Sequence, residues 1–198
     1  MRNNRIFDCI TFFQENFITN IRFEILNKYV DFFVVCESIY DHRGKKKEIN
    51  FKLNNPNFRN KVRHLILRDP FPENLNLWER QAFQREYIFN GIKDSHDDDY
   101  IMFSDPDEIP RPEKLEKLFL KKRYAIFQQK CFNYKLNLLN LNETPWSGTR
   151  LTKRKFLRAH RIVIWSLLGF MDTEPLTAEI ICAIRPKVIW YTQPQHWV

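Results

Sequence analysis

The chain has 198 residues, of which 43% are hydrophobic and 28% charged, and its formal net charge is +8. This length suits one domain, and these fractions exclude a disordered tail, a collagen-like fibre and a coiled coil. Glycine occurs only 4 times, and neither GxGxxG nor GxxxxGK[ST] is found, which argues against the glycine-rich phosphate loops.

Strand-like and helix-like segments alternate along the chain. Residues 5–11 are predicted to form a strand, residues 15–27 a helix with isoleucines at helical spacing, and residues 31–38 a strand that is apolar on both faces. Further elements are expected in this order: a strand over 62–67, a helix over 77–92, a strand over 99–104, a helix from Pro112 through Leu120, and one or two strands within 124–136. The alternation predicts an α/β fold with a mostly parallel sheet and helices on both faces.

The termini and cysteines indicate no special compartment. The charged residue Asp8 comes before any apolar stretch long enough for a signal peptide, and the apolar run 162–171 is about half as long as a bilayer requires. The sequence therefore predicts a cytoplasmic protein without a transmembrane segment. Without CxxC spacing, the four cysteines are expected to be buried, reduced thiols: Cys9, Cys36, Cys131 and Cys182.

Acidic residues are concentrated in one segment of this basic chain. Residues 94–108 contain seven acids and no bases. Such a cluster in basic surroundings suggests a divalent cation that bridges to an anionic ligand, with Lys and Arg side chains around its phosphates. The alternative is a solvated acidic loop beside unrelated surface charge, and residues 97–99 are interpreted in that way, as a solvated turn that caps the strand.

The sequence Ser-Asp-Pro-Asp-Glu over 104–108 directly follows a predicted strand. Ligands of open α/β sheets bind beyond the carboxyl ends of the strands, so this segment is expected to face a crevice. Pro106 restricts the backbone between Asp105 and Asp107. Two carboxylates at this spacing can jointly bind Mg²⁺ or Mn²⁺ and leave room for phosphates.

Several motifs in fixed order resemble glycosyltransferase family 17, the β-1,4-mannosyl-glycoprotein 4-β-N-acetylglucosaminyltransferase family. They run from about residue 5 to about residue 155: FDCITFFQE at 7–15, VDFFVVCES at 30–38 with His42 and Gly44-Lys45 after it, Trp78-Glu-Arg-Gln81 before Gln84-Arg85, and SDPDEIPRP at 104–112. The resemblance implies a GT-A fold, which is a Rossmann-like nucleotide-binding sheet. It implies one such domain over 1–198, with the part from about 160 to 198 diverged or shortened, because this part cannot be aligned with the family.

The resemblance also implies the ligands and the site. A UDP-sugar, UDP-GlcNAc above all, is the expected donor, a glycan or glycoconjugate the acceptor, and Mn²⁺ or Mg²⁺ the metal; no specific nucleic-acid partner is expected. The implied metal ligands are Asp105, Asp107 and Glu108. The side chains expected at the nucleotide are Phe7, Asp8, Phe12, Glu15, Glu37, Arg80, Arg85 and Asp105.

Other interpretations of three of these residues stay open. Phe12 suits the hydrophobic core as well as a ligand site. Glu15 suits the first turn of a helix, where a carboxylate interacts with the positive end of the helix dipole. Arg85 continues a helical apolar row, so it suits either the edge of the core with its head in solvent or contact with a diphosphate.

A β linkage made from an α-linked UDP-sugar requires inversion, for which a single displacement with a carboxylate base is the simplest route. Glu143 is the candidate base, Asp107 is the catalytic residue that acts through the metal, and Trp146 could stack on a sugar. Two other functions remain open. One is a catalytically silent nucleotide-sugar or glycan-binding module. The other is a basic, metal-dependent nucleic-acid-binding protein that uses Asp105 and Asp107.

Overall fold

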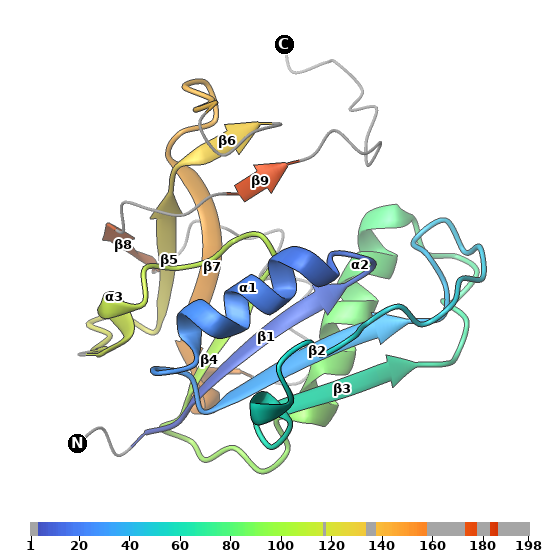
Figure 1. Ribbon diagram of the computed structural model, residues 1–198, viewed down its shortest axis with the longest axis horizontal. Helices are drawn as coiled ribbons and strands as arrows, with labels where there is room; N and C mark the ends of the chain where they lie inside the picture. The colour runs from blue at the N-terminus through green and yellow to red at the C-terminus, as the bar shows by residue number, and fades with distance from the viewer. Residues whose placement is uncertain (1–3, 117, 134–137, 158–172, 178–182, 186–198) are drawn as a thin grey trace.

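The computed structural model describes residues 4–116, 118–133, 138–157, 173–177 and 183–185 (Figure 1). Its strands and α-helices are β1 (Ile6–Phe12), α1 (Asn16–Leu26), β2 (Phe32–Ser38), β3 (Val62–Leu67), α2 (Leu77–Tyr87), β4 (Tyr100–Ser104), α3 (Glu113–Glu116), β5 (Tyr124–Gln129), β6 (Cys131–Asn133), β7 (Trp146–Lys153), β8 (Thr173–Thr177) and β9 (Ala183–Arg185). Three short 3-10 helices are η1 (Pro56–Phe58), η2 (Ile88–Gly91) and η3 (Arg154–Phe156).

The central sheet has seven strands in the order β3-β2-β1-β4-β7-β5-β8. Neighbouring strands are parallel except at β7, which runs antiparallel to β4 and β5. The chain adds β2 and β3 on one side of β1 and then β4 on the other, so the strand order reverses between β1 and β4. Open α/β sheets bind ligands beyond the carboxyl ends of the strands at such a reversal. The residues that follow β1 and β4 therefore occupy the favoured place for a site.

The two faces of β1 pack against different helices. Ile6 and Ile10 belong to a cluster with Phe23 of α1, whereas Phe7 belongs to a second cluster with Ile88 of η2. Figure 1 shows α1 in front of the sheet and α2 behind it. The expected α/β fold, with a mostly parallel sheet and helices on both faces, is confirmed.

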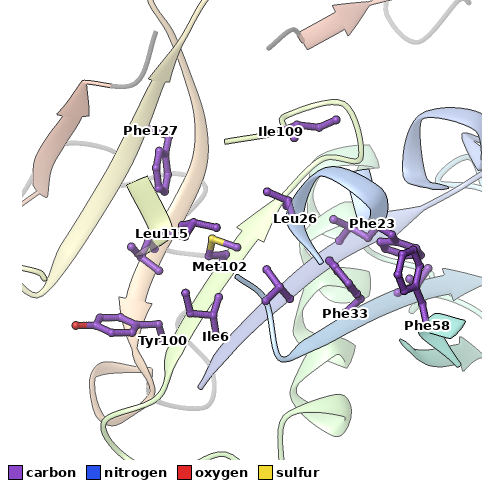
Figure 2. Close-up of a cluster of buried hydrophobic side chains, with 14 of the residues drawn as sticks. Ile6, Phe23, Leu26, Phe33, Phe58, Tyr100, Met102, Ile109, Leu115 and Phe127 are labelled. Atoms are coloured by element: carbon purple, nitrogen blue, oxygen red, sulfur yellow. The ribbon is translucent and has the colours of Figure 1, made fainter. Parts of the chain in front are cut away.

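The larger core cluster extends from α1 across the sheet to α3 and β5 (Figure 2). The rings of Phe23 and Phe33 lie 4.4 Å apart between centroids. Leu115 and Phe127 extend the cluster at the other end, and both are completely buried. Each such side chain contributes about 1.5–3 kcal/mol by burial, so α1 is held firmly on the sheet.

The helix predicted over 77–92 is shorter than expected. It starts with a capping box, in which the Asn76 side chain accepts from the Glu79 N–H while the Glu79 carboxylate accepts from the Asn76 N–H. The α-helix ends at Tyr87, and the tighter turn η2 follows. That turn brings Gly91 so close to the sheet that a Cβ there would lie 2.5 Å from Cγ1 of Val34.

Other elements also differ from the sequence-based expectations. The helix expected over 112–120 is the single turn α3, and the strands β7, β8 and β9 were not predicted. Polar residues hide β7, yet Thr149 and Thr152 are both 0% exposed. Their hydroxyls donate to the carbonyls of Glu108 and Arg123. Because these buried side chains are polar, β7 lacks the apolar pattern from which a buried strand is predicted. The strands expected up to residue 136 are confirmed as β1 to β6.

Cys9, Cys36 and Cys131 are buried thiols, as expected. Cys182, the apolar run 162–171 and most of the region from about 160 to 198 lie outside the described residues. Divergence of that region therefore stays a prediction. Across the part of the chain that the structure describes, no helix has the length and apolar character to cross a membrane.

Candidate functional site at the carboxyl edge of the sheet

Asp105 to Glu108 form a tight turn directly after β4. The Glu108 N–H donates to the Asp105 carbonyl at 3.1 Å, and the Asp105 N–H donates to Oε2 of Glu108 at 3.1 Å. The Trp146 indole donates to the other oxygen, Oε1, at 2.8 Å. Burial and the neighbouring Asp105 charge raise the pKa of Glu108, against which these hydrogen bonds act. The carboxylate of Glu108 therefore braces the turn from inside.

Arg85 brings a guanidinium to this turn from α2. Its Nη2 lies 2.8 Å from Oδ1 of Asp105, whose side chain is 40% exposed. Of the two interpretations of Arg85, the structure shows its head at the acidic turn, where it contacts a carboxylate. A partly exposed carboxylate and a guanidinium thus meet at the carboxyl end of β4.

His42 and Gln84, which the sequence had not assigned to the site, lie close to it, and the charges of Arg85 and Asp105 act on His42. The Gln84 amide donates to the Cys36 carbonyl at 2.8 Å and to the Phe12 carbonyl at 3.4 Å, and its oxygen lies 2.8 Å from Nε2 of His42. Burial lowers the pKa of His42 despite the Gln84 hydrogen bond, and the Arg85 charge lowers it further. The signal in the sequence was the adjacency of Gln84 to Arg85.

Glu37 lies at the end of β2 and is completely buried. Its carboxylate accepts from Nζ of Lys47 at 2.7 Å, from the N–H groups of Asn50 and Phe51 at 2.7 and 3.1 Å, and pairs with His64 at 3.1 Å. Burial would raise the pKa of Glu37, but these hydrogen bonds outweigh it and lower the pKa to about 2. The side chain therefore anchors the segment that follows β2, and the structure does not show it facing a ligand.

Replacing Glu37 by glutamine is expected to lower the free energy of unfolding by about 2–4 kcal/mol at neutral pH. Because the folded-state pKa lies below the ordinary 4.5, the unfolded chain binds the proton first as the pH falls. The stabilisation is complete above pH 4.5 and is lost towards pH 2. Urea unfolding should therefore show a difference between wild type and Glu37→Gln that shrinks with acidification. The exposed neighbour variant Glu48→Gln is the control, and a pH-independent difference would contradict the assignment.

Several other residues expected at the nucleotide lie in the interior. Phe7 and Phe12 are 0% and 2% exposed and pack in the core on opposite faces of β1. Asp8 is 1% exposed, and both of its oxygens accept from Arg22 at 2.7 Å. The alternation of a buried strand explains the difference from the expectation, because each side chain of β1 points into one of the two covered faces.

Glu15 and Arg80 lie on the same edge as the acidic turn but in local roles. Oε2 of Glu15 accepts from the N–H groups of Phe13 and Gln14, both at 3.0 Å, just before α1. Arg80 donates to the His42 carbonyl at 3.3 Å, and its Nε is buried without a hydrogen-bond partner among the described residues. Contact of either side chain with a nucleotide stays a prediction.

The acids of residues 94–108 separate into two groups at opposite ends of β4. Asp98 pairs with Lys153 and Lys155 at 2.9 Å each, and Asp99 pairs with Arg5 at 2.7 Å. These pairs tie the amino end of β4 to its neighbours, so the acidic segment is not one continuous patch. Within the ranges that the structure describes, no group of three His, Cys, Asp or Glu side chains is arranged to hold a metal ion.

Glu143 lies on the β5 side of the acidic turn. β5 and β4 point the same way, so their carboxyl ends share one edge, and Cys131 begins β6 with one residue between it and the end of β5. The Cys131 thiol donates to Oε2 of the exposed Glu143 at 3.3 Å. Gln129, at the end of β5, donates to the carbonyl of Ile109 at 2.8 Å. The structure therefore places Glu143 at the same edge as Asp105, opposite the side from which Arg85 approaches.

Taken together, the fold and site are those of an α/β protein with a carboxylate, a guanidinium and a second acid at its strand-order reversal. The family model described as glycosyltransferase family 17 matches residues 1–135. The chain belongs to glycosyltransferase family 17, as its motifs had suggested.

Two curated relatives share 30% identity with the chain in an alignment of 128 positions that covers 59% of this chain. They are the β-1,4-mannosyl-glycoprotein 4-β-N-acetylglucosaminyltransferases of Rattus norvegicus and Homo sapiens, of which the alignment covers 23% and 24%. The chain therefore spans about a quarter of the length of these relatives. Among solved structures, the chain resembles a 4-diphosphocytidyl-2C-methyl-D-erythritol synthase. The superposition covers 89% of this chain and 90% of the synthase chain, with 12% identity and a TM-score of 0.48. The superposition on a glucosyl-3-phosphoglycerate synthase of M. tuberculosis covers 90% of this chain and 72% of the synthase chain, with 13% identity and a TM-score of 0.43.

Proposed function

We propose that this chain transfers N-acetylglucosamine from UDP-GlcNAc to a glycan acceptor, in β linkage and with inversion, in a reaction that depends on Mn²⁺ or Mg²⁺. The observation that carries the proposal is the contact of Arg85 with Asp105 at 2.8 Å, at the reversal of the strand order. Family membership supports the transfer of a sugar, and the names of the two relatives support the choice of sugar and linkage.

The residues at the turn fit a divalent cation. Asp105 and Asp107 are partly exposed carboxylates two residues apart, and such hard oxygen ligands suit Mg²⁺ and Mn²⁺. These two side chains would hold the ion, which when bound would neutralise charge on the departing UDP. Glu108 was expected as a third ligand, but both of its oxygens already accept hydrogen bonds. We propose that it supports the turn instead.

Arg85 supplies the protein's own positive charge to the diphosphate. A guanidinium makes paired hydrogen bonds to phosphate oxygens, and α2 presents this one beside Asp105. The partly buried His42 and the buried Gln84 lie next to it, hydrogen-bonded to each other, and the lowered pKa of His42 favours the neutral imidazole. Arg85 therefore orients the donor, while the carboxylate of Asp105 keeps the guanidinium in place before the donor arrives.

Glu143 is the proposed general base. Its exposed carboxylate would take the proton from the acceptor hydroxyl as the new bond forms. Trp146 lies three residues further on, with its indole N–H fixed by Glu108. We propose that the Trp146 ring stacks on the acceptor sugar, so the acceptor would bind on the β5 side and the donor on the β1 side.

A panel of UDP-sugars, assayed for UDP release with and without Mn²⁺, tests the function. The wild type should release UDP from UDP-GlcNAc only with metal, and Asp107→Ala should lose that activity by a factor of about 100 or more. Asp97→Ala, which removes an exposed acid at the opposite end of β4, is the matched control and should retain it. UDP binding without release in the wild type would favour a silent module. Absence of nucleotide-sugar binding together with tight, salt-sensitive DNA or RNA binding would favour the nucleic-acid function.

A further inference from the structure

A charged side chain is buried directly beneath the acidic turn. Arg22 on α1 is 0% exposed and is the largest completely buried side chain among the described residues. Its Nη2 and Nε donate to Oδ1 and Oδ2 of Asp8, each at 2.7 Å. Asp8 on β1 is equally buried, so the pair is a bidentate ion pair without contact to solvent.

The other donors of this guanidinium all reach the segment from Ser104 to Glu108. Nη1 donates to the Glu108 carbonyl at 2.8 Å and to the Asp105 carbonyl at 3.4 Å, and Nη2 donates to Oγ of Ser104 at 2.8 Å. One side chain therefore holds the backbone of the turn at both of its ends.

Strand β7 completes the same network from the other side. Ser104 donates to Oγ1 of Thr149 at 2.7 Å, and Thr149 donates to the Glu108 carbonyl at 2.6 Å. The Glu108 carbonyl thus accepts from both Arg22 and Thr149. The side chains of Arg22, Ser104 and Thr149 are all buried.

Stability alone does not explain a buried pair at this place. Burying an ion pair brings little net stability compared with apolar side chains of similar size, because desolvation opposes the attraction. The pair Arg5–Asp99 already ties β1 to β4 at their amino ends, with Arg5 27% exposed. What distinguishes Arg22 is that its hydrogen bonds end on the backbone that carries Asp105 and Asp107.

We propose that Arg22, held by Asp8, is a positioning residue that fixes this turn and so directs the Asp105 and Asp107 carboxylates towards their cation. The inference rests on the proposed function for its ligand. Groups that orient metal ligands typically change metal affinity about 10- to 100-fold when they are replaced. Asp8, expected at the nucleotide, thereby acts through Arg22.

Arg22→Lys is the main test, because lysine keeps the charge beside Asp8 but cannot reproduce the fork of donors to the turn. Titration calorimetry measures UDP affinity with and without Mn²⁺, and the ratio gives the metal-dependent gain. We expect Arg22→Lys to reduce this gain about 10- to 100-fold and to leave metal-free UDP affinity unchanged. Arg5→Lys is the matched control and should change neither.

Amide exchange of the turn supplies a second measurement that needs no ligand. The N–H groups of Asp105 and Glu108 should exchange faster in Arg22→Lys than in the wild type or Arg5→Lys. An unchanged metal-dependent gain in folded Arg22→Lys, or an equal loss in Arg5→Lys, would overturn the proposal. If Arg22→Lys does not fold, Ser104→Ala, which removes one acceptor of the guanidinium, decides by the same two measurements.

The two proposals fail in different ways. A wild type whose UDP affinity does not respond to Mn²⁺ refutes the proposed function, and amide exchange then decides whether Arg22 holds the turn. A wild type that does respond, with an Arg22→Lys variant that responds equally, refutes the positioning role alone.

Discussion

Replacing Glu143 by glutamine is expected to lower the turnover number about 10²- to 10⁴-fold while the affinity for UDP and Mn²⁺ stays unchanged. Glutamine has nearly the same shape but cannot accept the proton of the acceptor hydroxyl. Since Glu143 is exposed and approaches from the β5 side, through its contact with Cys131, the substitution leaves Arg85 and Asp105 untouched. The loss should therefore appear in the turnover number and not in donor binding.

Initial rates at saturating UDP-GlcNAc, with calorimetry of UDP binding, separate these quantities. Glu48→Gln, at an exposed position on the segment after β2, is the control and should behave like the wild type. A turnover number within a factor of about 3 of the wild type would show that another group is the base.

Asp8→Asn should lower the free energy of unfolding by about 3–5 kcal/mol. Both side chains of the Asp8–Arg22 pair are 0% exposed, so the variant leaves the guanidinium in the interior without a counter-charge. The asparagine amide nitrogen is a donor, so one of the two Arg22 donors that Asp8 accepts from would lose its acceptor. The loss is large because water cannot reach the cation that remains.

Urea denaturation of wild type and variant measures this difference. Asp99→Asn is the matched control, since its partner Arg5 is partly exposed and stays solvated, so its loss should be smaller. The double variant Asp8→Leu, Arg22→Met removes both charges and should recover part of the stability. It should not recover the metal-dependent gain in UDP affinity. An Asp8→Asn variant no less stable than Asp99→Asn would contradict the buried-charge argument.

The fold class and the place of the acidic turn were predictable from local patterns. Runs such as Phe-Phe-Val-Val-Cys at 32–36 and the helical spacing of isoleucines over 15–27 report burial within one element. Asp105 and Asp107 were expected at the end of a strand, and the structure places them after β4. These burial patterns and the position of the acidic turn depend only on residues a few positions apart, so they can be recognised in the sequence.

The contacts of the site were not predictable in this way, because their partners are far apart in the chain. Arg22 meets Glu108 across 86 residues, and Gln84 meets His42 across 42. The family resemblance implied that Asp8, Phe7 and Glu37 lie at the nucleotide, whereas the structure shows each of them buried. The local sequence indicates at which end of a strand a residue lies, but it does not indicate which distant residue will be its hydrogen-bond or ion-pair partner.

The amino-acid sequence by itself determined the alternation of strands and helices, the family and the acidic turn at the end of β4. Tertiary structure alone decided that Arg85 faces Asp105, that β7 enters the sheet antiparallel and that Arg22 is buried beneath the turn. The physical reason is that burial patterns arise from each element's own periodicity. Pairing of charges and hydrogen bonds arises only when the packing of distant elements excludes water and leaves each polar group one set of partners.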